Sequence, residues 1–449
     1  MGKLFGTDGV RGIANIDLTA DLAYKLGQAG AYVLSGEIKH VPKILVGTDT
    51  RISGYMLESA LIAGICSVGA EAVCLGVMPT PAIAYLTKFY KADAGVVISA
   101  SHNPFEFNGI KFFNGSGYKL NDSIEESIEK IIENGNEDLP KPTGRLIGKK
   151  SVKESAMDDY IRFLQSTIDI DIKGVRIAID CANGAAWKLA PEVMKGLGAS
   201  VWTINTNPDG TNINEKCGST HYESIELFVK ECNADVGFAF DGDADRVIAV
   251  DEKGDIVDGD KILAITGLMM KKEGRLAKNT IVTTDMTNMG LIDMAKKEGI
   301  NVVKTKVGDR YVLEEMLNYG YNLGGEQSGH VIFLEHSTTG DGIITALQLL
   351  RAMGKTGKRL SELASVMRIF PQVLKNAKVK NDNKHLYHED KLISDKMKKI
   401  EEELNGRGRL LVRASGTEPL IRVMIEGEDI DSITKMALDL VNIIESRLG

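Results

Sequence analysis

The sequence predicts an α/β protein in which three related domains with mixed sheets, followed by a smaller α+β domain, surround one central cleft. Two observations predict the α/β domains: apolar strand-like runs alternate with stretches of helical period, and one order of these elements occurs three times. A third observation predicts the last domain, because the final segment, about 80 residues long, lacks this order and is large enough to fold by itself. The length of 449 residues allows each domain its own core.

Each repeat begins with an apolar strand that ends in a loop carrying an aspartate. These segments are Lys43–Gly54, Val175–Ala186 and Thr280–Gly290. A stretch of helical period follows, and a second strand begins after Gly69, Gly198 or Gly299. A third apolar strand then leads into a polar loop, and the three loops read SASHNP, DGDADR and GGEQSGH. Because ligands of such sheets gather at the carboxyl ends of strands, we expect these loops to share one cleft.

Turn residues and changes in composition place the domain boundaries. The first boundary follows the polar stretch 134–150 and precedes a helical pattern over 156–168. The second lies near 255, within a turn-rich strand pair at 251–260 that leads into the third repeat, and the third follows a helix at 360–366. The last domain reads as a few strands and then an amphipathic helix over 433–448. The predicted domains are 1–153, 154–255, 256–369 and 370–449.

The composition limits the partners and the compartment. The chain has 54 basic and 62 acidic residues, which argues against nucleic acid and membrane surfaces as partners. No signal peptide or transmembrane helix is expected, because the longest uncharged run, 72–87, is broken by two prolines. Five cysteines occur without a CxxC pair, mostly in apolar stretches, so we expect reduced thiols and a cytoplasmic protein.

The segment Ala94–Pro104, AGVVISASHNP, contains the first candidate catalytic residue. An apolar run enters a polar loop, which predicts a buried strand that delivers one hydroxyl to an exposed loop. Pro104 disfavours a helical Asn103, so we expect an extended loop in which Ser101 is free to carry a phosphoryl group. Considered alone, this segment is more typical of an ordinary strand-to-loop turn than of a catalytic loop.

The loop DGDADR, which follows the apolar run VGFAF, is a candidate metal site. Asp241, Asp243 and Asp245 alternate with small residues and can converge on one hard cation. An EF-hand loop is excluded, although Glu252 falls at its twelfth position, because Arg246 replaces the glycine at the sixth and strands flank the loop. Magnesium fits better, with Arg246 holding a phosphoryl oxygen. The alternative is a solvated acidic turn.

Four other segments carry polar groups suited to a phosphorylated sugar. GGEQSGH combines Glu326, Ser328 and His330 with glycines that allow close backbone approach. RASGTEPLIR, residues 413–422, combines arginines, hydroxyls and turn amides as an anion site would, although a capped turn would look similar. FGTDGVRG places Arg11 among glycines. Lys111 stands between apolar neighbours, so we expect either a desolvated amine with a lowered pKa or a lysine that reaches solvent.

These four motifs, SASHNP, DGDADR, GEQSGH and RASGTEP, stand in order with one in each domain, and the chain therefore resembles the α-D-phosphohexomutase superfamily. The similarity extends over essentially the whole length, and the ordered set is far more specific than any single motif. The opening FGTDGVRG, the segment DTRISGYMLESAL and the loop EQSGH are most similar to bacterial members that act on amino-sugar phosphates. The resemblance implies a four-domain, heart-shaped enzyme.

The resemblance also implies a role for each motif. Ser101 would be the phosphoserine and would bind magnesium together with Asp241, Asp243 and Asp245. Lys111 is the first choice for the general acid or base, with His102 and His330 assisting. Arg246 would offset charge on the transferring group, and Arg11 would contact the phosphoserine. The implied substrate-binding residues are Glu326 and Ser328 for the sugar hydroxyls and Arg413, Ser415, Gly416, Thr417 and Arg422 for the distal phosphate.

The implied reaction interconverts glucosamine 6-phosphate and glucosamine 1-phosphate through a bound bisphosphate and feeds UDP-N-acetylglucosamine synthesis. A sugar bisphosphate or another phosphoryl donor would prime Ser101, and a homodimer is left open as the assembly. Glucose or mannose phosphates are the alternative substrates of the same machinery. A phosphosugar-binding protein without turnover would not need both a phosphoryl carrier and three metal carboxylates. A serine hydrolase is disfavoured because GxSxG is missing.

Overall fold

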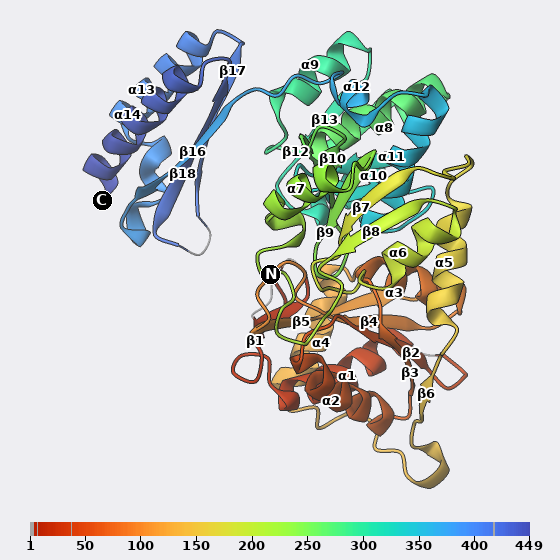
Figure 1. The fold of residues 1–449 in the computed structure, drawn as a ribbon. Helices are drawn as coiled ribbons and strands as arrows, with labels where there is room; N and C mark the ends of the chain where they lie inside the picture. The colour runs from red at the N-terminus through yellow and green to blue at the C-terminus, as the bar shows by residue number, and fades with distance from the viewer. Residues whose placement is uncertain (1–3, 7, 37, 416–417) are drawn as a thin grey trace. The chain divides into compact units, whose positions relative to one another are not determined.

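The computed structural model describes residues 4–6, 8–36, 38–415 and 418–449. The chain forms two compact units, and Figure 1 shows the helices and strands of both. The first unit comprises Met1–Thr287 and Glu298–Val366, and the second comprises Asn288–Lys297 and Met367–Gly449. Within the described residues, three sheets belong to the first unit and one to the second. The predicted α/β and α+β classes are both confirmed.

The first sheet has the strand order β1-β5-β4-β2-β3-β6. Strands β4, β2, β3 and β6 run parallel to one another, whereas β5 pairs antiparallel with β4 and with β1. The strands are β1 Val10–Ile13, β2 Lys43–Thr48, β3 Glu71–Val77, β4 Ala94–Ile98, β5 Phe107–Asn114 and β6 Lys150–Val152. The accompanying helices are α1 Ala20–Ser35, α2 Ser53–Ser67, α3 Thr80–Phe89 and α4 Asp122–Glu133, with a 3-10 turn at Gly144–Leu146.

The second sheet has the order β11-β10-β9-β7-β8, and the third has the order β13-β12-β14-β15. The second contains β7 Arg176–Asp180, β8 Ser200–Ile204, β9 Val236–Phe240, β10 Val247–Asp251 and β11 Ile256–Val257, with α5 Ala156–Ser166, α6 Leu189–Gly196, α7 Glu223–Glu231 and a 3-10 turn at Gly218–Thr220. The third contains β12 Thr280–Thr284, β13 Asn301–Thr305, β14 Leu323–Gly325 and β15 Val331–Phe333, with α8 Gly259–Lys272, α10 Asp309–Tyr319, α11 Gly342–Thr356, α12 Leu360–Ala364 and a 3-10 turn at Ala277–Asn279.

The predicted repeat is confirmed by the strand order. The repeated sets are β5-β4-β2-β3, β10-β9-β7-β8 and β15-β14-β12-β13. In each set the third strand of the repeat leads into the polar loop, and the next strand returns antiparallel to it. The three loops are therefore the tips of hairpins at the carboxyl ends of central strands, where a parallel sheet offers its ligand site.

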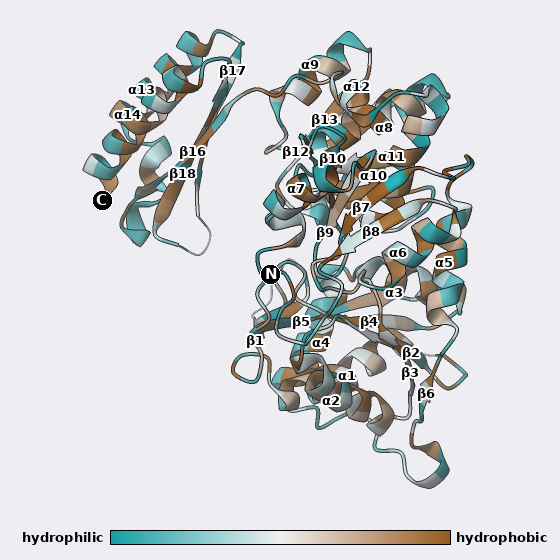
Figure 2. Ribbon diagram, in the orientation of Figure 1, coloured by the Kyte–Doolittle hydropathy of each residue, from teal (hydrophilic) through white to brown (hydrophobic). Residues whose placement is uncertain are grey.

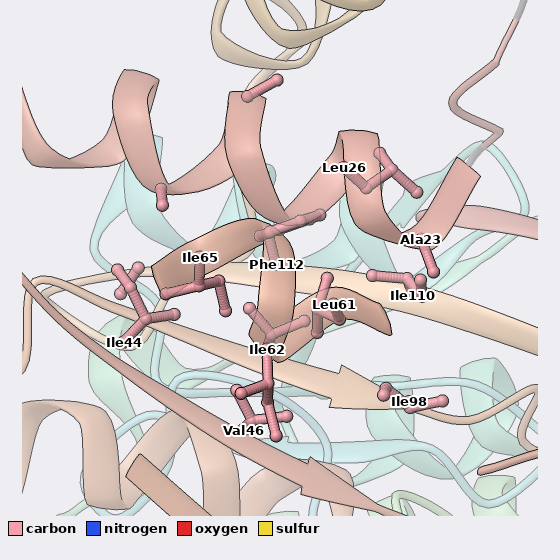
Figure 3. Packing of buried hydrophobic residues seen from close by; sticks show 14 of the residues in the cluster. Ala23, Leu26, Ile44, Val46, Leu61, Ile62, Ile65, Ile98, Ile110 and Phe112 are labelled. Carbon is pink, nitrogen blue, oxygen red and sulfur yellow. The ribbon is translucent and has the colours of Figure 1, made fainter. Parts of the chain in front are cut away.

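The core of the first domain shows why the sheet positions these tips rigidly. Leu26 of α1, Leu61 of α2 and Ile128 of α4 pack with Ile44 and Phe112 from one face of the sheet. Figure 3 shows the contact of α1, α2 and the strands from close by. On the other face, Ile83 of α3 lies directly over Gly47 and Gly95. Both faces are buried, as expected for a parallel sheet whose strands are continuous apolar runs.

The second unit contains an antiparallel sheet of order β16-β18-β17 and three helices. Its elements are α9 Met289–Lys297, β16 Gln372–Lys378, α13 Lys391–Leu404, β17 Gly408–Ala414, β18 Leu420–Gly427 and α14 Ile430–Leu448, with 3-10 turns at Asn381–Asn383 and Leu386–His388. The predicted C-terminal helix is confirmed and begins at Ile430, because Asp429 caps it. Helix α13 was not predicted, because most of its residues are polar and only Ile393, Ile400 and Leu404 are buried.

Helices that face solvent on one side alternate polar and apolar residues, and Figure 2 shows this mixture along α13 and α14. Helices α5 and α12 each end two residues before the sequence-based expectation, at Ser166 and Ala364. All five cysteines are free, as expected. In the part of the chain that the structure describes, no helix has both the length and the apolar character needed to cross a bilayer.

Candidate active site

Ser101 lies at the tip between β4 and β5, beside the aspartates of the second domain. Every residue of β4 is buried, and Ser101 is only 1% exposed. Its Oγ donates a hydrogen bond to Oδ2 of Asp241 at 2.7 Å. The expectation of an extended loop is wrong at this residue: Ser101 has φ 53°, in the left-handed region, and the Asn103 N–H closes a turn onto the Ala100 carbonyl.

Asp241, Asp243 and Asp245 form a compact buried cluster directly after β9. Each offers one carboxylate oxygen, and these oxygens lie within 4.8 Å of one another. Oδ1 of Asp243 and Oδ1 of Asp245 are buried without a hydrogen-bond partner among the described residues. Burial, and then the charges of Asp245 and Asp243, raise the pKa of Asp241 well above its usual value. Buried oxygens without partners and repelling carboxylates are the donor set that a hard divalent cation satisfies, so the cluster fits a metal ion.

Asp243 is fixed from the first domain. Thr80 Oγ1 donates to Oδ2 of Asp243 at 2.6 Å, and Lys111 Nζ donates to the same oxygen at 2.9 Å. The N–H of Thr80 also donates to the main-chain oxygen of Asp243. Burial raises the pKa of Asp243, but the charge of Lys111 and the bond from Thr80 outweigh burial and lower it. The carboxylate is therefore ionised, with Oδ1 left for a cation.

Lys111 is buried, which was one of the two alternatives expected, but the lowered pKa expected together with burial is wrong. Burial alone lowers the pKa of Lys111, whereas the carboxylates of Asp243 and Asp8 raise it, and the net shift is upward. Nζ lies 2.9 Å from an oxygen of each carboxylate. Two close opposite charges favour the ammonium form more than desolvation disfavours it, so this lysine is an acid rather than a free amine.

A chain of alternating charges links the first domain to the third. Asp8 contacts Lys111, Lys119 at 2.6 Å and Arg11 at 2.5 Å. Lys119 in turn contacts Asp309 at 2.5 Å. Burial raises the pKa of Asp8, but the charges of Lys111, Lys119 and Arg11 hold it well below its usual range. Because the pKa values of Asp8 and Asp309 are lowered and those of Lys111 and Lys119 are raised, these four groups stay charged near pH 7.

Arg246 and His102 flank the phosphoryl position expected at Ser101. Nε of Arg246 lies 3.7 Å from Oδ1 of Asp245 and is buried with no hydrogen bond to any described residue. Nδ1 of His102 lies 3.4 Å from Oγ of Ser101. Burial, and then the charges of Arg246 and Arg11, lower the pKa of His102 to about 4. The imidazole is therefore neutral near pH 7 and can accept a proton.

His330 joins the third loop to the acidic cluster. Its Nδ1 lies 3.5 Å from Asp245 and its Nε2 lies 3.6 Å from Asp309. Burial lowers the pKa of His330, but the charge of Asp245 and then that of Asp309 raise it overall. Nε2 accepts the N–H of Gly340 at 3.1 Å, which needs a lone pair on that atom. The ring held by this geometry carries its proton on Nδ1, toward Asp245.

Glu326 and Ser328 lie in the same loop and face the pocket. Oε1 of Glu326 accepts the N–H of Gly308 at 3.0 Å, which fixes the carboxylate against the start of α10. Ser328 is exposed. The pocket has a volume of about 780 Å³ and is open to solvent at Ser328. All three α/β domains line it, through Arg11 and His102, through Asp245 and Arg246, and through Glu326 and His330.

The predicted phosphate loop lies between β17 and β18 of the second unit. Arg413 and Arg422 are directly opposite each other in the strand register. Ser415 is buried, and its Oγ accepts the N–H of Glu418 at 3.2 Å. Arg422 contacts Glu418 at 3.1 Å. The predicted residues Gly416 and Thr417 lie outside the described residues.

Comparison with known families covers the whole chain. Models for domains I, II, III and the C-terminal domain of phosphoglucomutase/phosphomannomutase match residues 2–139, 158–254, 258–370 and 374–443. The chain belongs to the phosphoglucomutase/phosphomannomutase family. Among its relatives, proteins named phosphoglucosamine mutase from Acetivibrio thermocellus and Ruminiclostridium cellulolyticum are each 65% identical over 449 residues, and each match covers 100% of both chains.

Solved structures share the family fold at low identity. A phosphoglucomutase/phosphomannomutase family protein from Burkholderia thailandensis has a TM-score of 0.80 and 23% identity, covering 98% of this chain and 97% of that one. An N-acetylphosphoglucosamine mutase from Aspergillus fumigatus, in complex with GlcNAc-6P and magnesium, has a TM-score of 0.69 and 18% identity, covering 99% and 96%.

Within the family fold, most of the sequence-predicted residues come together in the first unit. Ser101 and the three aspartates are in contact, and Arg11, His102, Arg246, Glu326, Ser328 and His330 line one pocket. Lys111 lies behind that pocket, on Asp243. Arg413, Ser415 and Arg422 lie in the second unit.

Several residues that hold the site were not predicted. Thr80 and Arg51 are separated from their partners by long stretches of chain, and a threonine between two prolines looks like a helix start. Asp8 lies in the FGTDGVRG motif together with Arg11, so its charge in that motif could have indicated that it belongs to the site. Lys119 and Asp309 belong to no motif that indicates a contact between them.

Proposed function

We propose that this protein interconverts glucosamine 6-phosphate and glucosamine 1-phosphate, with Ser101 as the phosphoryl carrier and Mg²⁺ at the aspartate cluster. The observation that carries the proposal is the 2.7 Å bond from Ser101 Oγ to Asp241, within a cluster in which two buried carboxylate oxygens have no hydrogen bond to any described residue. Full-length relatives that are 65% identical and named phosphoglucosamine mutase support an amino sugar as the substrate.

In the proposed reaction the free hydroxyl of the bound sugar monophosphate attacks the phosphorus on Ser101. The bond from phosphorus to Oγ breaks as the bond to the sugar oxygen forms, and a bisphosphate results. The sugar then turns over, so that its other phosphate returns a phosphoryl group to Oγ. Transfer of this kind depends on positioning and on compensation of charge, which the partly exposed Arg246 in the pocket wall offers. Mg²⁺ bound to Asp241, Asp243 and Asp245 would neutralise charge on the transferring group.

The proton of the attacking hydroxyl needs an acceptor, and Ser101 Oγ needs a donor in return. We assign Lys111 as the acid, because its two carboxylate partners keep it protonated. His102 is neutral, and its Nδ1 lies 3.4 Å from Oγ of Ser101. We assign it as the assisting base that accepts the proton of the attacking hydroxyl. His330 positions Asp245, and Arg11 faces the phosphoserine from the pocket wall.

The sugar and its distal phosphate are assigned to two further groups. Glu326 and Ser328 face the pocket and would bind sugar hydroxyls. Arg413 and Arg422 stand opposite each other, and like charges in that position repel unless an anion lies near them. This pair, with Ser415, Gly416 and Thr417, is the proposed phosphate site.

The remaining features of the proposal concern the protein as a whole. Its domains are 1–153, 154–255, 256–369 and 370–449. A sugar bisphosphate or another phosphoryl donor primes Ser101, and the product feeds UDP-N-acetylglucosamine synthesis in the cytoplasm. A homodimer remains the proposed alternative to a monomer.

The proposal is tested by measuring kcat/KM in the direction of the 6-phosphate for glucosamine 1-phosphate, glucose 1-phosphate and mannose 1-phosphate, with Mg²⁺ and a trace of sugar bisphosphate. We expect the amino sugar to be preferred. A preference for glucose 1-phosphate or mannose 1-phosphate would show that the enzyme has a different substrate specificity within the family. Absence of turnover with all three substrates would overturn the mutase function.

A further inference from the structure

Three main-chain carbonyls of the serine loop accept hydrogen bonds from Arg51, and two of them also accept from Asn214. The carbonyl oxygens of Ser101 and Asn103 accept hydrogen bonds from Arg51 Nη2 at 2.8 and 2.9 Å, and that of Pro104 accepts one from Nη1. The first two also accept from Asn214 Nδ2, at 2.9 and 3.1 Å. Arg51 comes from the first domain and Asn214 from the second, so the loop is held from two sides.

The amide of Ser101 is connected to the same network. Nε of Arg51 donates to Oδ2 of Asp49 at 2.8 Å, and Oδ2 of Asp49 accepts from Ser99 Oγ at 2.6 Å. Ser99 Oγ in turn accepts the N–H of Ser101 at 3.0 Å. Arg51 is 1% exposed, and its buried charge is paired with the carboxylate of Asp49. Both polar groups of the Ser101 backbone are therefore bound.

These bonds hold a backbone conformation that a serine does not favour. Ser101 has φ 53°, where the Cβ atom crowds the backbone. Gly242 of the metal loop packs against the same residue, since a Cβ there would lie 2.5 Å from the Ser101 carbonyl oxygen. The conformation directs Oγ at Asp241, and a relaxed loop would turn the hydroxyl away from the aspartate cluster.

We propose that Arg51 and Asn214 are positioning residues that hold Ser101 in the left-handed conformation and so aim its phosphoryl group at the metal cluster and the substrate. This inference rests on the proposed function. Neither side chain touches the reacting atoms, and both act through the carbonyls of the loop. Removal of either one should therefore slow phosphoryl transfer without weakening the binding of the sugar phosphate, because a small misplacement of a reacting group is costly.

Asn214→Gly is the main test, because Asn214 itself has φ 58° and glycine retains that conformation while losing the amide donor. We expect kcat to fall between about 10- and 100-fold, with KM for the sugar phosphate changed less than about twofold. The ³¹P resonance of phosphorylated Ser101 should also shift. The matched control is Asn233→Gly, at φ 49° and far from the loop, which should retain wild-type kcat.

A second variant, Arg51→Lys, keeps the charge but loses the planar guanidinium group that reaches three carbonyls. Its kcat should fall as in Asn214→Gly, while its KM should change as little. An unchanged kcat and ³¹P spectrum in folded Asn214→Gly would overturn the inference, as would an equal loss in the Asn233→Gly control. If the wild-type protein shows neither turnover nor a phosphoserine signal, the proposed function fails first, and the inference fails with it.

Discussion

At the level of single residues, the site combines groups that attract the substrate phosphate with groups that would repel it. The three buried aspartates need compensation, and Lys111 supplies part of it at Asp243 while Arg246 supplies part at Asp245. Asp241 has no such cation within ion-pair distance among the described side chains, and its pKa is raised by burial and by its two neighbours. The cluster could hold a divalent cation, which would complete the charge balance.

Thr80→Val should weaken metal binding, because the variant keeps the volume but loses the hydrogen bond to Oδ2 of Asp243. Loss of such an outer partner typically costs about 10- to 100-fold in metal affinity. The Mg²⁺ concentration for half-maximal activity should rise by that factor, and so should the Mn²⁺ concentration needed to raise the melting temperature. Thr87→Val is the control, since the hydroxyl of Thr87 donates to the Ile83 carbonyl of its own helix and contacts no carboxylate among the described residues. Equal Mg²⁺ requirements in both variants would contradict the assigned role of Thr80.

The sequence identified most of the candidate residues that the structure brings together, but not the residues that hold them in place. Ser101, Asp241 and Arg246 belong to short motifs that mark a strand end followed by polar residues. Their supports come from distant positions, such as Thr80, which is separated from Asp243 by 163 residues. The expected fall in the pKa of Lys111 was wrong for the same reason: its burial could be anticipated from its apolar neighbours, whereas the two carboxylates that outweigh burial could not.

At the level of elements, each site loop is aimed by a buried strand and braced by the helices around it. The strands β4 and β9 are fully buried, so the loops that follow them start from rigid positions. Helix α11 begins beside the same region, where Oδ1 of Asp341 accepts the N–H groups of Ile343 and Ile344 and the Tyr160 hydroxyl donates to Oδ2. Burial raises the pKa of Asp341 to about 6 from 3.8.

The raised pKa of Asp341 predicts how Asp341→Asn changes stability with pH. In wild type the folded state holds the proton more tightly than the unfolded chain, so ionisation costs stability. The cost is absent below about pH 4, grows to about pH 6 and is constant above it, at about 3 kcal/mol. Relative to wild type, the variant should therefore become more stable by up to that amount as pH rises from 4 to 6, measured by urea unfolding. A difference that does not vary with pH would contradict this assignment.

The contact of α1 and α2 depends on glycines at the crossing point. A Cβ on Gly64 would lie 2.1 Å from the Tyr24 carbonyl oxygen, and one on Gly27 would lie 2.3 Å from that of Leu61. Gly64→Ala should therefore separate the helices and lower stability by about 1–3 kcal/mol. Gly54→Ala in the same helix is the control, because its nearest neighbour would be 3.8 Å away, and it should be neutral or gain up to about 1 kcal/mol. Equal unfolding midpoints for the two variants would refute the close packing.

For the whole molecule, three copies of one topology provide three different loops. The repeat could be predicted because its strands are apolar runs and its loops are polar, and the strand orders of the three sheets agree with it. The antiparallel return strand of each repeat was not predicted. Contacts between repeats were also beyond prediction, since Lys119 and Asp309 are separated by 190 residues and pair only because two domains meet.

The second unit was predicted less completely, for a physical reason. Helix α13 has few buried residues, so its sequence reads as a polar segment. Residues 288–297 group with the C-terminal segment, and Asn288 bonds to both the N–H and the carbonyl of Phe370. Neither hydrophobic periodicity nor composition indicates that residues 288–297 group with a segment much later in the chain.

The central claim, that Ser101 stores a phosphoryl group beside the aspartate cluster, is tested most directly by intact-mass measurement. Wild-type protein and Ser101→Ala would be compared before and after incubation with glucose 1,6-bisphosphate and Mg²⁺, with peptide mapping of any modified species. The account predicts that wild type gains the mass of one phosphoryl group on the peptide that contains Ser101 and that Ser101→Ala gains none. Phosphorylation at another residue, or equal modification of both proteins, would contradict it.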